Sequence, residues 1–302
     1  MRKSRPSTTG RRYRAALLPL AAVMCVALAG CAAGQNAITP GPASTIRSAT
    51  QIDLPLLAYL PTVDELKLMG EGTAELQVKC AARYGVTIDP QEPDMASIST
   101  RYTADRRYGI VNRDEVEQYG YESAPGQYHS PEKWEDPEQP FEVEVLSGTT
   151  EDGSPSQLQD KDGNTLPEGG CGLIGSKESS GGHPRSEWDV ADVLLGEAWD
   201  RLLADPGFQA AEADWATCMS KSGYDFQHRW DAANSLTGDD PERSQDMALL
   251  DLDCAEETNY IGRAMAIDVA IQNQLISDNE ASLRAALDIQ KERLSIAKKA
   301  LQ

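Results

Sequence analysis

The chain contains three histidines, His129, His183 and His228, and no sequence motif gives any of them a catalytic or metal-binding partner. They follow Gln-Tyr, Gly-Gly and Phe-Gln, which are contexts typical of loops. The His-Glu-x-x-His signature of zinc proteases is missing, and no serine lies in a Gly-x-Ser-x-Gly motif. We therefore predict ordinary surface histidines, no catalytic residues, no bound metal and no cofactor.

Carboxylates could in principle supply acid and base chemistry. Asp136 with Glu138, or Glu142 with Glu144, could act on a glycan, because glycoside hydrolysis needs two carboxyl groups at a defined separation. The chain has 48 acidic residues, so such pairs arise by chance. They do not predict an enzyme.

A second acidic stretch, Asp160–Asn164, resembles a calcium loop only superficially. Counted from Asp160, Gly163 is fourth and Glu168 ninth, whereas an EF-hand loop needs glycine sixth and glutamate twelfth. We predict a turn here, with room for one short hairpin.

Aromatic residues gather loosely in the middle of the chain. They could line a platform for sugars, or they could anchor an irregular segment to the body, and their spacing fits neither a helix face nor a strand face. We favour anchoring. The residues are Tyr102, Tyr108, Tyr119, Tyr121, Tyr128 and Trp134.

The chain positions its cysteines in two groups. Cys25 and Cys31 lie near the N-terminus, and four more follow: Cys80, Cys171, Cys218 and Cys254. Four body cysteines are an even number, which favours two disulfides in a protein that is exported, and their wide spacing disfavours a metal site. Four cysteines allow three pairings.

An internal similarity favours one pairing. Cys80 and Cys218 are each followed by a glycine five residues later, at Gly85 and Gly223, as at the end of a helix. A further cysteine follows in each half of the chain. We therefore favour Cys80–Cys171 and Cys218–Cys254.

The N-terminus has the pattern of an export signal. Six basic residues precede the apolar run Ala15–Ala29, which ends in Leu28-Ala29-Gly30-Cys31. The run is shorter than the roughly 20 residues needed to span a bilayer. Arg11-Arg12 could mark a twin-arginine signal, although their neighbours fit that pattern poorly. We predict a signal peptide at 1–30 and lipidation, including palmitate, at Cys31.

The chain is strongly acidic. It carries a net charge of −20 over 302 residues, and removal of the signal takes away six positive charges, which gives −26. Such a surface repels nucleic acid, so no nucleic-acid partner is expected. The charge fits solubility, with attraction of cations or of a basic partner as the alternative.

We divide the body into three segments. A flexible tether is expected at 31–55, a helix followed by an irregular region at 56–185, and a helical region at 186–302. Helical periodicity covers 62–84, where Thr62 can cap the helix and Gly70 and Gly72 are expected to split it. Alternation in 141–145 predicts a strand.

The last segment is the most regular. A helix capped by Ser186 should break at 205–207, a second should end at Gly223, and a third should begin near Pro241 and continue with few breaks to the C-terminus. A partial heptad runs along that end, through Ile276, Leu283 and Ala297 and through Leu287, Leu294 and Leu301. It could pack on its own domain or on an envelope protein partner.

These features together predict a mainly α fold: a helical body with a long irregular middle region, a long C-terminal helix and two disulfides. Three stretches, Leu28–Cys31, Trp215–Tyr224 and Gly169–Cys171, resemble uncharacterised lipoproteins of high-GC Gram-positive bacteria. That resemblance implies a location in the envelope and a helical, disulfide-linked body. It implies no catalytic residues.

Two functions remain open at the level of sequence. The first is a non-enzymatic lipoprotein, held in the cell membrane on its extracytoplasmic face by acylated Cys31, with a binding or scaffolding role in the envelope. The alternative is a solute- or glycan-binding accessory of a transport system, with a pocket in 86–185. An envelope hydrolase is the remote third function, because no catalytic motif supports it.

Overall fold

A computed structural model describes residues 39–90, 93, 104, 106–122, 140–236 and 241–302. Across these ranges the chain is mainly helical and forms no β-strand, and both disulfides are present. The predicted fold class is therefore confirmed. None of the helices in these ranges is both long and apolar enough to cross a membrane.

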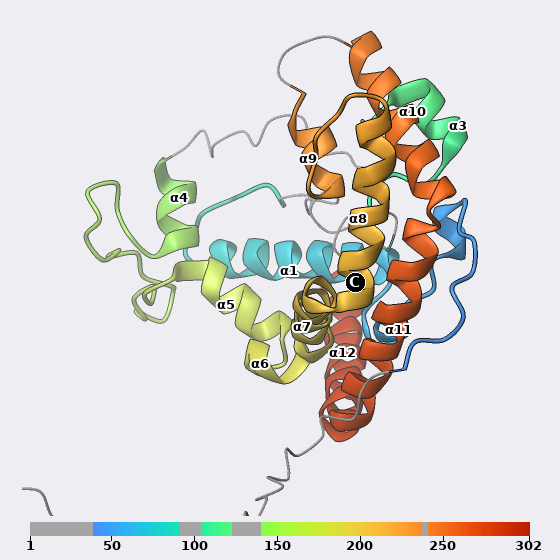
Figure 1. The fold of residues 1–302 in the computed structure, drawn as a ribbon. Helices are drawn as coiled ribbons and strands as arrows, with labels where there is room; N and C mark the ends of the chain where they lie inside the picture. The colour runs from blue at the N-terminus through green and yellow to red at the C-terminus, as the bar shows by residue number, and fades with distance from the viewer. Residues whose placement is uncertain (1–38, 91–92, 94–103, 105, 123–139, 237–240) are drawn as a thin grey trace, which may run out of the picture. The chain divides into compact units, whose positions relative to one another are not determined.

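The helices follow one another along the whole described chain (Figure 1). The first half contains the 3₁₀ helices η1 (Ala49–Gln51) and η2 (Pro55–Tyr59) and the α-helices α1 (Val63–Arg83), α3 (Arg113–Tyr119), α4 (Pro140–Ser147) and α5 (Gly170–Ser179). The second half contains α6 (Arg185–Trp188), α7 (Val190–Ala204), α8 (Pro206–Lys221), α9 (Arg229–Asn234), α10 (Pro241–Glu257), α11 (Tyr260–Asp278) and α12 (Glu280–Ala300).

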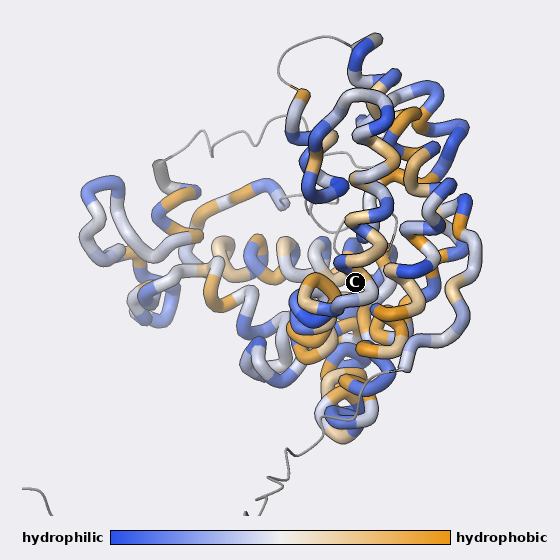
Figure 2. The backbone as a smooth tube through the Cα atoms, viewed as in Figure 1, coloured by the Kyte–Doolittle hydropathy of each residue, from blue (hydrophilic) through white to orange (hydrophobic). Residues whose placement is uncertain are grey.

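Most of the apolar side chains form one large core. Helices α7, α8, α10 and α11 pack around it, and its largest fully buried side chains include Trp215, Tyr260 and Phe208. Hydrophobic residues gather where these helices face one another (Figure 2). Burial of large aromatic side chains makes this core the main source of stability.

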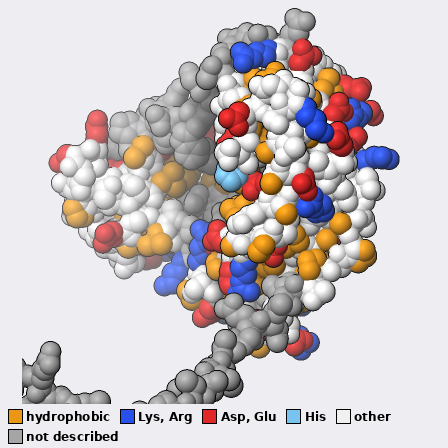
Figure 3. All heavy atoms as spheres, viewed as in Figure 1, with side chains coloured by type: hydrophobic (Ala, Val, Ile, Leu, Met, Phe, Trp, Pro, Cys, Tyr) orange, Lys and Arg blue, Asp and Glu red, His pale blue; other side chains and the backbone are white. Residues whose placement is uncertain are grey.

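Charged side chains cover the outside. On the face seen in Figure 3, acidic and basic side chains lie scattered among polar and hydrophobic ones. Several of the pairs lie one helical turn apart, for example Arg201 with Glu197 and Arg284 with Glu280. Exposed pairs of this kind contribute little to stability, about 0–1 kcal/mol each.

Helix α1 crosses the molecule as one unbroken element (Figure 1). Thr62 caps it through a capping box with Glu65, and Gly85 ends it with a φ of +74°, as predicted. The expected split at Gly70 and Gly72 is wrong. Gly72 instead lets α12 approach closely, because a Cβ there would lie 2.6 Å from the Cβ of Ala297.

A small core forms at the far end of α1. Helix α5 packs on α1 and on α4, and the Cys80–Cys171 disulfide joins α1 to α5. The small core consists of six buried residues: Cys80, Ala81, Ile88, Val145, Leu166 and Cys171.

The strand predicted at 141–145 is wrong, because this stretch belongs to helix α4. Its alternation extends over only five residues, and the described chain nearby offers only isolated bridges, Thr149 with Pro155 and Gln159 with Thr165. A strand without a partner leaves its backbone groups unpaired, whereas a helix pairs them internally. Val145 is fully buried in the helical form.

The tether predicted at 31–55 does not extend to residue 55. Ile46, Ile52 and Leu54 are at most 8% exposed and belong to the large core. Ser48 caps η1 and the backbone continues directly into η2. The packed chain therefore begins at or before Ile46.

Short connections divide the helices of the C-terminal stretch. Ser186 lies inside α6 and does not cap it, and the chain breaks again at Asp189. Helices α10 and α11 are separated at Asn259, whose φ is +49°, and α11 and α12 at Asn279. The third predicted helix therefore continues to the C-terminus with two short breaks, at Asn259 and Asn279, and ends in the long helix α12.

The break at Asn279 divides the predicted heptad. Ile276 lies on α11, while Leu283 and Ala297 lie on α12, where both are at most 1% exposed. Helix α12 packs along α1, α6 and α7. The buried part of the heptad therefore contacts this chain itself.

Candidate functional site

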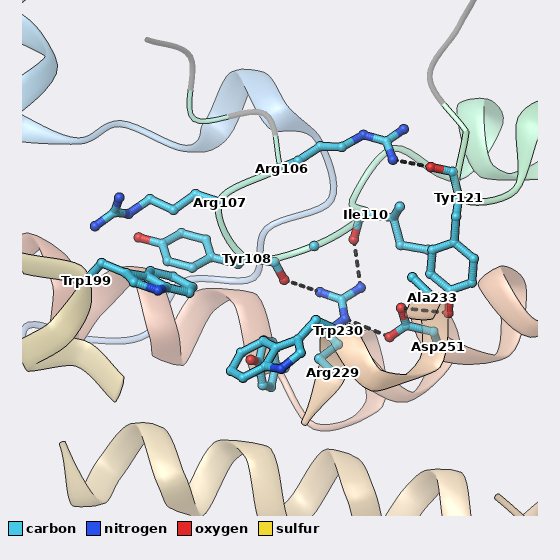
Figure 4. A pocket seen from close by; sticks show the side chains of 12 residues that line it. Arg106, Arg107, Tyr108, Ile110, Tyr121, Trp199, Arg229, Trp230, Ala233 and Asp251 are labelled. Carbon is cyan, nitrogen blue, oxygen red and sulfur yellow. Dashed lines mark hydrogen bonds and ion pairs between the residues drawn. The ribbon is translucent and has the colours of Figure 1, made fainter. Parts of the chain in front are cut away.

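A pocket of about 390 Å³ opens where the loop Arg106–Ile110 passes over α9. Trp199 of α7 and Trp230 of α9 line it together with Tyr121, Asp251 and Tyr260 (Figure 4). Its size falls in the usual range for sites that bind small molecules.

Arg229 forms the floor of the pocket. Its side chain is 3% exposed, and each guanidinium nitrogen has an acceptor 2.7 Å away: Asp251 Oδ1 from Nε, the Tyr108 carbonyl from Nη1 and the Ile110 carbonyl from Nη2 (Figure 4). These bonds hold the loop on α9 and α10. Because all three nitrogens are used, Arg229 shapes the pocket and has little capacity left for a ligand.

Asp251 neutralises that arginine and is 1% exposed. It also accepts hydrogen bonds from Trp215 Nε1 at 2.9 Å and from the Tyr121 hydroxyl at 3.2 Å. Burial, followed by the charge of Asp251, raises the pKa of Tyr121, so the phenol stays protonated. A buried carboxylate with three donors is fully compensated.

Asp268 on α11 forms a second buried network. It is fully buried and accepts from Arg107 Nε at 2.5 Å, from the Tyr108 hydroxyl at 2.7 Å and from Gln272 Nε2 at 2.8 Å. Burial and the neighbouring carboxylate raise the pKa of Tyr108 well above its usual value. The two networks fix both sides of the loop Arg106–Ile110.

Two tryptophans form the aromatic wall. The ring centroids of Trp199 and Trp230 lie 6.5 Å apart with the planes at 54°. The guanidinium carbon of Arg107 lies 5.3 Å from the centre of Trp199, and His228 stacks on Trp230 at 4.7 Å. Trp230 keeps 39% of its surface exposed.

Several hydrogen-bond donors at the pocket have no acceptor among the residues that the structure describes. They are the indole N–H groups of Trp199 and Trp230, Nη1 of Arg107 and the hydroxyl of Tyr260. Tyr260 is only 2% exposed, and burial raises its pKa, so its hydroxyl remains a donor.

The side chains of the pocket are suited to binding. No Ser, Cys, His or Lys is among its described lining residues, and the two carboxylates of the networks are occupied by donors. Nucleophilic catalysis needs a nucleophile beside a base. The arrangement offers aromatic surface and donors instead.

The four body cysteines form the favoured pairs. Cys80–Cys171 and Cys218–Cys254 both have bonding distances, 2.01 and 2.03 Å. Neither pair lines the pocket. Cys31 lies outside the described residues, so its predicted lipidation stays a prediction.

The predicted surface histidines are dispersed. His183 lies 3.0 Å from Glu187 and 3.5 Å from Glu292, and its pKa is raised, chiefly by the hydrogen bond with Glu187. His228 contacts Glu212 at 3.2 Å and stacks on Trp230 beside the pocket. His129 lies outside the described residues.

Of the two candidate carboxylate pairs, only Glu142 and Glu144 lie in the described chain, and neither lines the pocket. Glu144 accepts from the Ser156 hydroxyl, Glu142 also lies on α4, and Asp136 and Glu138 fall outside the described residues.

At Asp160 the predicted turn is confirmed. Its Oδ1 accepts from the backbone N–H groups of residues 162 and 164, and Gly163 has a φ of +82°.

Two of the middle aromatics reach the pocket. Tyr108 and Tyr121 line it, both held by buried carboxylates, whereas Tyr119 does not. Tyr102, Tyr128 and Trp134 lie outside the described residues. The anchoring role is therefore confirmed for Tyr108, because its hydroxyl joins the loop to α11.

Sequence reasoning missed most of the site. It did not identify Trp199, Trp230, Tyr260, Arg229 or Asp251 as neighbours, because α7, α9, α10 and α11 meet only in the fold. One signal was available: Asp251 and Asp268 occupy positions on the buried faces of α10 and α11, where a charge needs a partner.

Comparison of the chain with protein-family models, with curated proteins and with solved structures finds no match.

Proposed function

We propose that this chain is an exported lipoprotein, anchored through acylated Cys31 on the extracytoplasmic face of the cell membrane, that binds a small solute in the pocket beside Trp199 and Trp230. The observation that carries the binding role is the pocket itself: about 390 Å³, walled by two tryptophans and built on two compensated buried charge networks. Binding would leave the solute chemically unchanged.

The construction of the site supports a stable, preformed pocket. Arg229 and Asp268 together hold the loop by four hydrogen bonds of 2.5–2.7 Å, two to its backbone carbonyls and two from the side chains of Arg107 and Tyr108. Preorganisation lowers the entropic cost of ligand binding. The two disulfides agree with an exported protein.

A scaffolding role through the C-terminal helix has less support. The buried positions of α12, Leu283, Ala286 and Ala297, already contact the chain itself. An envelope protein partner would need a different surface. For this reason we place the solute-binding role first.

The test compares the full chain, purified with its lipid in detergent, with the variant W199A/W230A. We expect small ring compounds to raise the melting temperature of the unmodified protein and to shift its indole NMR signals. The double variant should lose this response because the wall has been removed. Val193→Ala is the control, since Val193 lies on α7, is 63% exposed and does not line the pocket.

Two results would contradict the binding role. One is that no ring compound in a diverse set binds at millimolar concentration. The other is that binding is unchanged in W199A/W230A while Val193→Ala behaves like the original. The anchor is tested separately, because Cys31→Ala should move the protein from the membrane fraction to the medium.

A further inference from the structure

We propose that the pocket selects a flat ring compound that carries a carboxylate group, an inference that rests on the binding function proposed above. Among the described residues, the pocket side-chain groups without a hydrogen-bond partner are three N–H donors, Nε1 of Trp199, Nε1 of Trp230 and Nη1 of Arg107, and the Tyr260 hydroxyl, which can donate or accept. A ligand that pairs with them must bring acceptors. A carboxylate brings two oxygen atoms and up to four acceptor positions.

The side-chain acceptors of the site are already occupied. Asp251 accepts from Arg229, Trp215 and Tyr121, and Asp268 accepts from Arg107, Tyr108 and Gln272. A neutral sugar would have to donate from each hydroxyl as well as accept. The pocket offers few acceptors for those protons, and unpaired polar groups weaken binding. The excess of free donors over free acceptors at the pocket therefore disfavours a glycan as the ligand.

A cationic ligand is disfavoured because the one carboxylate among the described lining residues, Asp251, is already paired with Arg229. The other two lining arginines, Arg106 and Arg107, are paired with Glu115 and Asp268. Tryptophan faces attract cations, but the guanidinium of Arg107 already lies over Trp199 at 5.3 Å, and His228 covers one face of Trp230. An anion can instead accept a charge-assisted hydrogen bond from Nη1 of Arg107, which has no acceptor among the described residues.

The ring of the ligand has a defined place. Trp199 and Trp230 approach at 6.5 Å and at an angle of 54°, so they form an open wedge on one side of the pocket (Figure 4). A flat apolar ring can stack against either indole. Arg107, whose guanidinium lies over Trp199, would then meet the carboxylate. Tyr260 lines the same pocket beside Arg229, with its ring centre 5.4 Å from the guanidinium carbon.

The test uses three probes of one shape that differ only in charge: 2-naphthoate, 2-naphthamide and 2-naphthylmethylammonium. Titration calorimetry with the full lipidated protein should show 2-naphthoate binding about tenfold more tightly than the amide, the value of one charge-assisted hydrogen bond. The ammonium probe should bind most weakly. Methyl β-glucoside serves as the neutral sugar probe and should not bind measurably.

A pair of tyrosine variants locates the effect. Tyr260→Phe should weaken 2-naphthoate several-fold and leave the unfolding midpoint unchanged, because its hydroxyl has no partner among the described residues. Tyr119→Phe on α3 is the control. Tyr119 does not line the pocket, so this variant should keep both the affinity for 2-naphthoate and its preference over the amide.

The outcomes separate the ligand class from the binding function. The carboxylate proposal is overturned if the amide or the ammonium probe binds as well as 2-naphthoate, or if the sugar binds better. In that case the proposed binding function still stands, provided that binding depends on Trp199 and Trp230. If none of the four probes binds, the carboxylate proposal is overturned as well. If 2-naphthoate binds equally to W199A/W230A, the pocket itself is not the binding site.

Discussion

The two disulfide-linked regions of this molecule differ in what else holds them together. Cys80–Cys171 joins α1 to α5 around the small core, which has only six buried residues. Cys218–Cys254 joins α8 to α10, which already pack on each other within the large core. The same covalent device therefore works in two environments of very different packing.

The large core also has polar support that the small core lacks. Asp251, Arg229 and Trp215 form a buried network beside Cys254, and Asp268 forms another on α11. The small core has no comparable buried ion pair among its described residues. We infer that the small core depends on its disulfide, whereas the large core depends on apolar burial and on its networks.

The largest expected effect is the loss of the first disulfide. In the chain-entropy model a bridge that closes a loop of 91 residues contributes about 4.6 kcal/mol. In C80A/C171A we expect α4, α5 and the turns between them to exchange amide hydrogens rapidly, because six buried residues cannot replace that energy. Hydrogen exchange with mass spectrometry measures this segment by segment.

The large core provides the internal control for that experiment. Amides of α8 and α11 should keep their protection in C80A/C171A, and probe binding at the pocket should persist. Unchanged protection of α4 and α5 would show that the small core is stable without its bridge, and the contrast between the two regions would then be lost.

Loss of the second disulfide should have a smaller and more uniform effect. A loop of 36 residues corresponds to about 3.8 kcal/mol in the same model. In C218A/C254A we expect one cooperative transition at lower urea concentration, because the bridge joins helices that the core already holds. Urea unfolding followed by tryptophan fluorescence tests this. A separate early transition of α8 would contradict it.

The helices and the favoured disulfide pairs could be predicted from the sequence, because the caps and glycines that indicate them lie close to them along the chain. Thr62 with Glu65 marks the start of α1, and the glycines that follow Cys80 and Cys218 mark helix ends with positive φ, at Gly85 and Gly223. Capping and periodicity depend on neighbours along the chain. They predict elements without knowledge of the fold.

The predictions from sequence were wrong where tertiary contacts determine the local structure. The alternation at 141–145 is local, but Val145 is buried by α5, so packing selected a helix. Gly72 looked like a helix breaker because only the fold reveals that α12 lies against it. The pocket could not be predicted because Trp199, Arg229 and Tyr260 come from three helices separated along the chain.

Gly72 connects the two regions, since α1 carries the small core and α12 belongs to the large part. A Cβ at residue 72 would lie 2.6 Å from the Cβ of Ala297 and must displace it. We expect Gly72→Ala to destabilise the protein by about 1–3 kcal/mol, the usual cost of overpacking. Gly196→Ala on α7 is the matched control, because no atom lies within 4 Å of its Cβ position.

The control should change stability in the opposite direction. Alanine exceeds glycine in helix propensity, so Gly196→Ala should gain up to about 1 kcal/mol. Denaturant unfolding of both variants gives the two values directly. If Gly72→Ala is also stabilising, the contact between α1 and α12 is looser than its geometry indicates, and the two regions are connected less firmly.

The smallest effect concerns the polar support of the large core and its dependence on pH. Glu212 on α8 is 6% exposed, and burial raises its pKa above the usual 4.5, although the hydrogen bond with His228 opposes this. The folded state therefore binds a proton more readily than the unfolded chain does. Its contribution to stability is present at acidic pH and is lost as the pH rises past the raised value.

Glu212→Gln removes this titration. As the pH rises from acidic to neutral values, the unmodified protein should lose stability relative to the variant, because the raised pKa of Glu212 favours the folded state only where the carboxyl is protonated. Glu197→Gln on α7 is the control, because Glu197 is an exposed residue paired with Arg201 and should leave the pH profile unchanged. Parallel profiles for the original and Glu212→Gln would mean that His228 fully compensates the buried carboxylate, so that the large core carries its charge at no cost.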